Sequence, residues 1–216
     1  MAKFLTLNTH SWMEEEQEIK LNQLAERILQ EKYDVICLQE VNQLMESEQV
    51  VQAPFYQAVE GAIAIHQDHF ALCLVEKLVK AGLDYHWSWA YNHIGFDIYN
   101  EGVAILSRNP LSPREVLVSE VNDPRDYHTR KVLIAETEVE GQLMTISSCH
   151  LSWWNKGFQE EWEQLEAELL KVSSPVVLMG DFNNPVDYEG YQHIMRSPLK
   201  LQDSHKVAEK IVGKAT

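Results

Sequence analysis

Five polar residues stand at or just after the ends of apolar segments: Asn8, Glu40, His150, Asp181 and Asn183. A carboxylate at the partly buried end of such a segment is unfavourable unless a cation or a hydrogen-bond donor offsets its charge. Mg²⁺ prefers oxygen ligands and keeps several waters, so one or two protein carboxylates suffice to hold it. A histidine nearby can donate to a phosphoryl oxygen or transfer a proton near neutral pH. Together these groups indicate metal-assisted hydrolysis of a phosphate ester.

Each of these residues also has an ordinary structural interpretation. Asn8 can be a turn former, Glu40 a helix-capping or surface acid, and His150 a histidine hydrogen-bonded within the fold. The segment Gly180–Asn183 can be a simple turn after a strand, since Gly, Asp and Asn are common turn residues. The chemical interpretation therefore depends on all of these residues lying together.

The first two apolar segments are predicted to be strands on either side of a helix. Residues 4–8 alternate apolar and polar side chains, as in a strand, and residues 21–28 carry apolar side chains at helical spacing. Val35–Leu38 is a continuous apolar run, which is typical of a buried strand. Open α/β sheets gather functional side chains at strand ends, so Glu40 is expected at such an end.

The rest of the chain continues this pattern with further strands and another helix. The predicted elements are a strand over Gly102–Leu106, a hairpin of Lys131–Val139 and Leu143–Cys149, a helix over residues 158–171 and a strand over Pro175–Met179. No Gly/Ser-rich or charged linker separates them. We therefore predict one α/β (α+β) domain with mixed sheets over residues 1–216.

Residues 41–97 are harder to interpret, and we expect them to form an insertion-like segment within the domain. Two stretches, 44–51 and 68–82, are partly helical in pattern. Between Tyr85 and Tyr91, four aromatic rings alternate with smaller or polar residues, which places them on one face of an extended strand. That aromatic face either packs beneath a helix layer or forms a substrate-stacking surface.

The charge of the chain argues against a general polyanion binder. It has 18 lysine and arginine residues against 33 acidic residues, a formal net charge of −15. Nucleic-acid binding modules normally carry an excess of clustered basic residues. A small-molecule or lipid-like phosphoester is therefore the favoured partner, and a nucleic acid is less favoured.

The cysteines and the hydropathy favour a cytoplasmic protein. Cys37, Cys73 and Cys149 lie far apart without Cys-x-x-Cys spacing, which fits buried thiols in a reducing compartment. The N-terminus has no basic segment followed by a sustained apolar one, and no apolar run is long enough to cross a bilayer. The oligomeric state is left open.

Five separated motifs resemble those of the endonuclease/exonuclease/phosphatase superfamily, in the order expected of that family. They are Leu5–Asn8, Asp34–Glu40, Asn100–Arg108, Ser148–Leu151 and Gly180–Asn183. The resemblance implies a two-sheet mixed β-sandwich flanked by helices in four layers. It also implies a metal-dependent hydrolase that acts on phosphomonoesters or phosphodiesters.

The resemblance also implies roles for the polar residues. Glu40 matches the principal Mg²⁺ ligand of the family, with Mn²⁺ or Ca²⁺ as possible substitutes, and Asn8 lies close by to contact the metal water or the phosphate. Asp181 and Asn183 are expected to orient the attacking water and to hold a phosphoryl oxygen. His150 matches a histidine that hydrogen-bonds the phosphate.

Arg130 stands where many members of the family carry an arginine that contacts the phosphate, although a surface ion pair is an equally good interpretation. In-line phosphoryl transfer needs little covalent participation by the protein. It needs positioning and stabilisation of negative charge, which these residue types supply.

The family normally ends in a strand tip with Ser-Asp-His, whose Asp and His form the general base, and no such motif occurs up to Thr216. Asp203–His205 contains the same letters in another order, and we reject it as the base. The chain is thus expected to lack its last strands, either as a fragment, which we favour, or as a natural short form. The 216-residue form is then expected to have little or no activity, and a non-catalytic binding module is an alternative.

The substrate is not selected by the sequence. Trp153 and Trp154 follow the predicted strand end at His150, and with Trp87 and Trp89 they can form an aromatic rim around a ring-shaped or apolar leaving group. Core packing of these tryptophans is the alternative. Sugar phosphates, inositol phosphates, sphingolipids and nucleotides all stay open, as does a metal-dependent nuclease.

Overall fold

Two four-stranded sheets pack face to face in the computed structural model, which describes residues 1–213. The first sheet has the order β1 (Phe4–Asn8), β2 (Val35–Leu44), β4 (Tyr99–Ser107), β3 (His86–Gly95). The second has the order β5 (Ser112–Leu117), β6 (Lys131–Val139), β7 (Gln142–His150), β8 (Val176–Asp181). Each sheet mixes one parallel pair with antiparallel pairs, as the sequence predicted.

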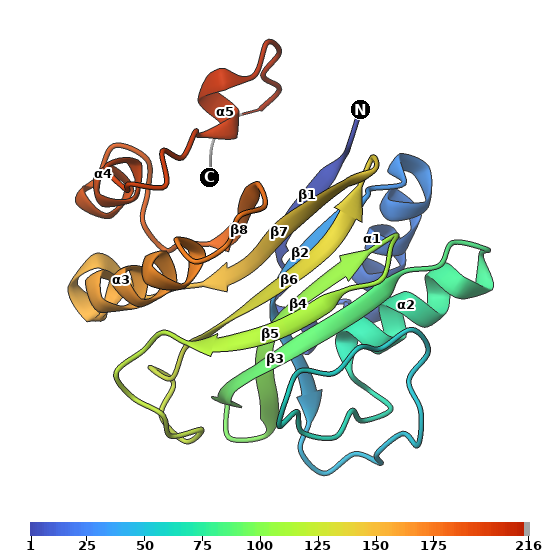
Figure 1. Ribbon diagram of the computed structural model, residues 1–216. Helices are drawn as coiled ribbons and strands as arrows, with labels where there is room; N and C mark the ends of the chain where they lie inside the picture. The colour runs from blue at the N-terminus through green and yellow to red at the C-terminus, as the bar shows by residue number, and fades with distance from the viewer. Residues whose placement is uncertain (214–216) are drawn as a thin grey trace.

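Helices cover the outer faces of the sandwich. Figure 1 shows α1 (Gln17–Glu31) and α2 (Phe70–Lys80) on one side of the strands and α3 (Phe158–Leu169) on the other. Two short helices, α4 (Glu189–Met195) and α5 (Ser204–Val207), follow β8 on the side of α3. Short 3₁₀ turns lie at Ser11–Met13 and Trp154–Lys156. Within residues 1–213, no helix has both the length and the apolar character needed to cross a bilayer.

Three apolar layers hold these elements together, and they confirm the four-layer sandwich. Leu21, Leu38 and Leu74 belong to the layer between the helices α1 and α2 and the first sheet. The layer between the two sheets includes side chains of β2, β4, β6 and β7, and a third lies between the second sheet and α3. The inner strands are buried on both faces, which explains why they are continuous apolar runs in the sequence.

The aromatic residues of β3 and its approach belong to the first of these layers. Trp87 and Trp89 are almost completely buried, and they pack against His69 at the start of α2. Their indole N–H groups donate to the carbonyl oxygens of Pro54 and Val41. The packing interpretation is therefore confirmed, and Trp87 and Trp89 are excluded from an exposed substrate rim.

The structure corrects one expectation for residues 41–97. A helix over 44–51 was wrong, because β2 continues to Leu44, paired with Tyr99, and the chain then turns. The stretch 45–51 has no apolar stripe to bury against the core, whereas the predicted helix over 68–82 is present as α2. The segment supplies the end of β2, the core helix α2 and the whole of strand β3.

The two parallel strand pairs explain why the predicted site residues meet. β1 runs parallel to β2, with Asn8 beside Gln39, and β7 runs parallel to β8, with His150 beside Asp181. Parallel strands end at the same edge, so both pairs bring their polar ends together. Gly180 permits the second pairing, because a Cβ atom there would lie 2.0 Å from the carbonyl oxygen of Cys149.

A buried carboxylate fixes the segment that follows His150. Glu161, in the first turn of α3, is 2% exposed and accepts hydrogen bonds from the backbone N–H (2.7 Å) and the hydroxyl (2.6 Å) of Ser152. Burial raises the pKa of Glu161, while its hydrogen bonds with Ser152 act in the opposite direction. Glu161 thereby ties the end of β7 to α3.

Replacing Glu161 should destabilise the fold. Glu161→Ala leaves two buried donors of Ser152 without an acceptor, and we expect the free energy of unfolding in urea to fall by about 2–3 kcal/mol. Glu161→Gln keeps one acceptor oxygen and should cost about half as much. The exposed Glu163→Ala on the same helix is the control, and an equal urea midpoint for Glu161→Ala and Glu163→Ala would contradict this role.

Candidate active site

A pocket of about 420 Å³ opens at the edge where the strand ends meet. Four of the predicted residues line it, namely Glu40, Arg130, His150 and Asn183. Its volume is within the range of pockets that bind small molecules, roughly 300–1,000 Å³. The remaining lining residues include the buried His93 and Glu101 and several exposed apolar side chains.

The amide of Asn8 joins the carboxylates of the two sheets. Its Nδ2 donates to Glu40 Oε1 at 2.7 Å and to Asp181 Oδ2 at 3.1 Å. Its Oδ1 accepts from the backbone N–H of His10 at 3.2 Å, which orients the amide. Asn8 is therefore not merely a turn former, because it brings β1, β2 and β8 to one point.

Glu40 does not lie at the end of its strand, as the sequence predicted, but at an irregular position inside β2. The pairing with β4 shifts between Leu38 and Val41, and Glu40 has a φ of 53°, in the left-handed region. Such a backbone costs about 1–2 kcal/mol for a residue other than glycine. The Ser11 hydroxyl donates to the Glu40 carbonyl at 2.5 Å and supports this geometry. The bulge presents the Glu40 side chain to the pocket instead of continuing the regular strand alternation.

His150 and Arg130 form the opposite wall of the site. An Arg130 Nη1 atom lies 3.4 Å from His150 Nδ1. A guanidinium only donates, so Nδ1 accepts and the neutral imidazole carries its proton on Nε2. Burial, followed by the charge of Arg130, lowers the pKa of His150 to about 3. The distance of 3.9 Å between His150 Nε2 and Glu40 Oε1 is therefore not an ion pair at neutral pH.

Arg130 has spare hydrogen-bonding capacity. Its Nε atom is buried and has no hydrogen-bond partner within residues 1–213. Burial lowers the pKa of its guanidinium, whereas Glu161 and Glu101 act in the opposite direction. The backbone N–H of Arg130 donates to the Ser119 hydroxyl, which fixes the residue just before β6. This is not the exposed side chain of a surface ion pair.

Asp181 and Asn183 form a tight turn after β8. The Asp181 Oδ1 atom accepts from the backbone N–H of Asn183 at 2.9 Å, and Asn183 has a φ of 50°. The Asn183 Nδ2 atom donates to the carbonyl oxygen of Leu151 at 2.8 Å, beside His150. A second N–H and the Oδ1 atom of that amide remain available to a ligand.

Sequence reasoning missed two buried residues of the pocket, His93 on β3 and Glu101 on β4. His93 Nε2 lies 3.5 Å from Glu101 Oε1. Burial and the charge of Glu40 raise the pKa of Glu101 to about 7, and burial followed by Arg130 lowers that of His93 to about 4. Glu101 lies within the motif Asn100–Arg108, so the sequence did carry a signal for it, an acidic residue beside an apolar strand. The sequence carried no comparable signal for His93.

The donor set fits a hard cation that keeps most of its waters. Within residues 1–213, no cluster of three or more His, Cys, Asp and Glu side chains encloses a metal position. Glu40 nevertheless offers a partly exposed carboxylate to the pocket. The pocket also contains Glu101, and repulsion between the two negative charges contributes to the raised pKa of Glu101. Mg²⁺ needs only one or two carboxylates, so Glu40 with Asn8 can hold it and relieve this repulsion.

Two groups of residues considered in the sequence lie elsewhere. Asp203 caps α5 by accepting from the backbone N–H of His205, and it also accepts from the Tyr191 hydroxyl. Neither Asp203 nor His205 lines the pocket, which agrees with rejecting them as the general base. Trp154 packs against Phe158, so of the four tryptophans considered for a rim only Trp153 lines the pocket.

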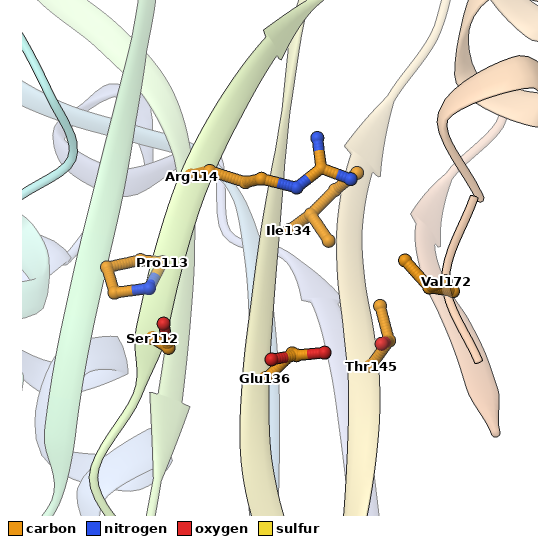
Figure 2. A pocket seen from close by; sticks show the side chains of 7 residues that line it. All are labelled: Ser112, Pro113, Arg114, Ile134, Glu136, Thr145 and Val172. Atoms are coloured by element: carbon orange, nitrogen blue, oxygen red, sulfur yellow. The ribbon is translucent and has the colours of Figure 1, made fainter. Parts of the chain in front are cut away.

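A second hollow, of about 240 Å³, lies on the outer face of the second sheet. Figure 2 shows its side chains on neighbouring strands, with Arg114 beside Ile134 and with Glu136 and Thr145 below. Arg114 is already paired with Glu168 at 3.2 Å. None of the predicted site residues lines this hollow, whereas Glu40, Arg130, His150 and Asn183 line the first pocket.

Comparison with known proteins agrees with this geometry. The model of the Endonuclease/Exonuclease/phosphatase family matches residues 15–205. A solved structure described as an endonuclease/exonuclease/phosphatase family protein from Leptotrichia buccalis C-1013-b is 32% identical, with a TM-score of 0.84. The match covers 97% of this chain and 77% of that one. No curated protein matches.

More distant structures share the fold. One is ANGEL2, described as a 2′,3′-cyclic phosphatase, at 20% identity and a TM-score of 0.57 over 86% of this chain and 48% of that one. Another is D. rerio TDP2 complexed with a single-strand DNA product, at 15% identity and a TM-score of 0.56 over 90% and 64%. From the family match, the Leptotrichia likeness and the shared sandwich, we conclude that the chain belongs to the endonuclease/exonuclease/phosphatase family.

Proposed function

We propose that this protein is a Mg²⁺-dependent phosphoesterase that acts on a small phosphomonoester or phosphodiester. The observation that carries the proposal is the contact chain Glu40–Asn8–Asp181, whose Glu40 lines one pocket together with His150 and Arg130. The carboxylate oxygens suit a cation, and the N–H donors of His150 and Arg130 suit a phosphoryl group.

Arg130 and His150 bind the phosphoryl group in this proposal. The unpartnered Nε–H group of Arg130 supplies a charge-assisted hydrogen bond. The neutral His150 ring donates its Nε2–H to another phosphoryl oxygen, because Arg130 occupies the Nδ1 side. Both groups stay hydrogen-bond donors as negative charge accumulates on the phosphoryl oxygens. They therefore stabilise the transition state electrostatically.

Glu40 and Asn8 hold the metal, with Mn²⁺ or Ca²⁺ as substitutes for Mg²⁺. When bound, the ion supplies Lewis-acid polarisation of the phosphoryl group and lowers the pKa of coordinated water. Asp181, held by Asn8 and by the Asn183 backbone, accepts a hydrogen bond from the attacking water and orients it in line. The free amide groups of Asn183 hold a phosphoryl oxygen.

The pocket favours a substrate with one phosphate group. Among its lining residues Arg130 is the only lysine or arginine, and the chain carries a net charge of −15. A polynucleotide binds through several phosphate contacts, each of which needs a cation. The likeness to D. rerio TDP2, whose structure is a complex with a single-strand DNA product, keeps a metal-dependent nuclease as the second candidate. A lipid-like ester is compatible with the pocket as well.

The cellular setting is proposed from the thiols. Cys37, Cys73 and Cys149 are all free, and two of them are buried in the sandwich. Such thiols are typical of a reducing compartment, which supports the cytoplasm. A binding module that keeps the metal and phosphate pocket is the alternative to an enzyme.

Metal binding should depend on Glu40. We expect calorimetric titration with Mg²⁺ to show one site in the wild-type chain, weakened at least about tenfold in Glu40→Gln, because metal-site changes commonly cost 10- to 100-fold in affinity. Glu46→Gln, an exposed acid just beyond β2, is the control and should bind like the wild type. Equal Mg²⁺ affinity for Glu40→Gln and the wild type would contradict the assignment.

Phosphate binding should depend on the guanidinium group of Arg130. In the presence of Mg²⁺, we expect Arg130→Ala to weaken binding of inorganic phosphate by about 10- to 100-fold, which is the range of a charge-assisted hydrogen bond, about 1.5–3 kcal/mol. Arg130→Lys should recover only part of this, because it keeps the charge but loses the planar donors. Arg114→Ala, in the other hollow, is the control, and an equal loss there would argue against a specific phosphate position.

Slow hydrolysis should follow the same residues. We expect the chain to hydrolyse bis(p-nitrophenyl) phosphate at a low rate above background, only with Mg²⁺, and Glu40→Gln to abolish that rate. Positioned metal and donors retain part of their effect even where a base is absent. Turnover that persists in Glu40→Gln, or in excess chelator, would contradict the proposed mechanism.

A further inference from the structure

Three exposed aromatic residues line the same pocket. Phe96, Tyr127 and Trp153 line it, with exposed fractions of 59%, 56% and 54%. They come from three separate connections: the β3–β4 turn, the loop before β6 and the segment after β7. Single exposed aromatic side chains are common, but several of them at one cavity are typical of a ligand-binding surface.

Phe96 occupies a backbone position that aromatic residues avoid. It is the first of two central residues in the β3–β4 turn, where the Ile98 N–H donates to the Gly95 carbonyl oxygen. Both central residues have positive φ, 52° at Phe96 and 62° at Asp97, and Asn or Gly is favoured in such a turn. The ring is exposed and the backbone is strained, so stability does not explain a phenylalanine here.

Tyr127 belongs to an ordered loop. The Thr129 hydroxyl donates to the Asp123 carbonyl oxygen, and the loop joins β3 through the Ile94 N–H and the Pro124 carbonyl oxygen. The Tyr127 ring lies 3.9 Å from the His128 ring, centroid to centroid. The loop therefore holds the phenol ring in place before any ligand binds.

Trp153 stands close to the phosphoryl side of the pocket. It follows Ser152, whose backbone is fixed by Glu161, and it lies three residues after His150. Its indole ring is half exposed and lines the same cavity as Arg130. The cavity is thus lined by both polar and aromatic side chains.

We propose that Phe96, Tyr127 and Trp153 form an aromatic rim that binds a planar ring on the alcohol side of the substrate. This inference rests on the proposed function and narrows it to small phosphoesters with one phosphate next to a nucleobase or an aryl ring. Planar rings stack on aromatic side chains irrespective of their hydrogen-bonding pattern. The lone Arg130 cation restricts the ligand to a single phosphate, which sets it apart from a polynucleotide.

The test compares ligands that differ only in the ring. Calorimetric binding with Mg²⁺ present would use adenosine 5′-monophosphate against ribose 5-phosphate, and phenyl phosphate against cyclohexyl phosphate. We expect the planar member of each pair to bind about 5- to 100-fold more tightly, as expected for base-aromatic stacking. A preference only for adenosine 5′-monophosphate identifies the ring as a nucleobase, and equal preferences identify any aryl ring.

Variants of the rim should remove this preference without changing phosphate binding. Phe96→Asn, Tyr127→Leu and Trp153→Ala should each reduce the ratio between planar and non-planar ligands, while affinity for inorganic phosphate stays unchanged. Tyr188→Ala, an aromatic residue that is 67% exposed and does not line the pocket, is the control. Phe96→Asn should also keep or raise the urea midpoint, because asparagine tolerates positive φ.

The possible failures are distinguishable. Equal affinity for planar and non-planar ligands, with binding that still depends on Arg130, would overturn the rim and leave the phosphoesterase proposal standing. A lower urea midpoint for Phe96→Asn together with an unchanged ligand ratio would show that Phe96 is structural. If no phosphate compound binds the wild-type chain, the proposed function and the rim both fail.

Discussion

The Asn8 amide, held between two carboxylates from different sheets, is the interaction on which the site depends. Its Nδ2 reaches Glu40 on the first sheet and Asp181 on the second. Two carboxylates this close are stable only with donors or a cation between them. Asn8 supplies one donor group, which fixes the positions of both acids and leaves oxygen atoms for a ligand. The sandwich thus acts as a frame that presents one charged edge.

Because the two sheets meet at this edge, the pocket has two chemically different walls. Glu40 and Glu101 concentrate negative charge on the first sheet, while Arg130 and the neutral His150 supply donors from the second. A metal-bound phosphoryl group carries both signs of charge, so it matches both walls at once. Backbone strain occurs at three positions around this pocket, Glu40, Phe96 and Asn183, all at positive φ. Strain of this kind concentrates at functional sites, where the surrounding structure compensates for it.

The sequence predicted three strand ends well, because a buried strand contains a run of apolar residues and a polar residue follows where the run stops. Asn8, His150 and Asp181 lie at such ends. Glu40 also follows an apolar run, but β2 continues past it to Leu44, because a bulge interrupts the strand there instead of ending it. The pattern did not reveal His93, which lies inside β3 and meets Glu101 only through strand pairing. It also placed a helix at 44–51, where β2 ends at Leu44 and the following stretch turns, because it has no apolar stripe to bury against the core. Exposed loop aromatics such as Tyr127 have no periodicity to read.

The central claim is that Glu40 and Asn8 share one ligand site with His150 and Arg130. Anomalous diffraction from crystals of the chain grown with Mn²⁺ and phosphate tests it most directly. We predict a manganese peak within coordination distance of a Glu40 oxygen, with phosphate density bridging it to His150 Nε2 and Arg130. A manganese ion bound elsewhere, or phosphate at the Arg114 hollow with an empty Glu40 pocket, would contradict the account.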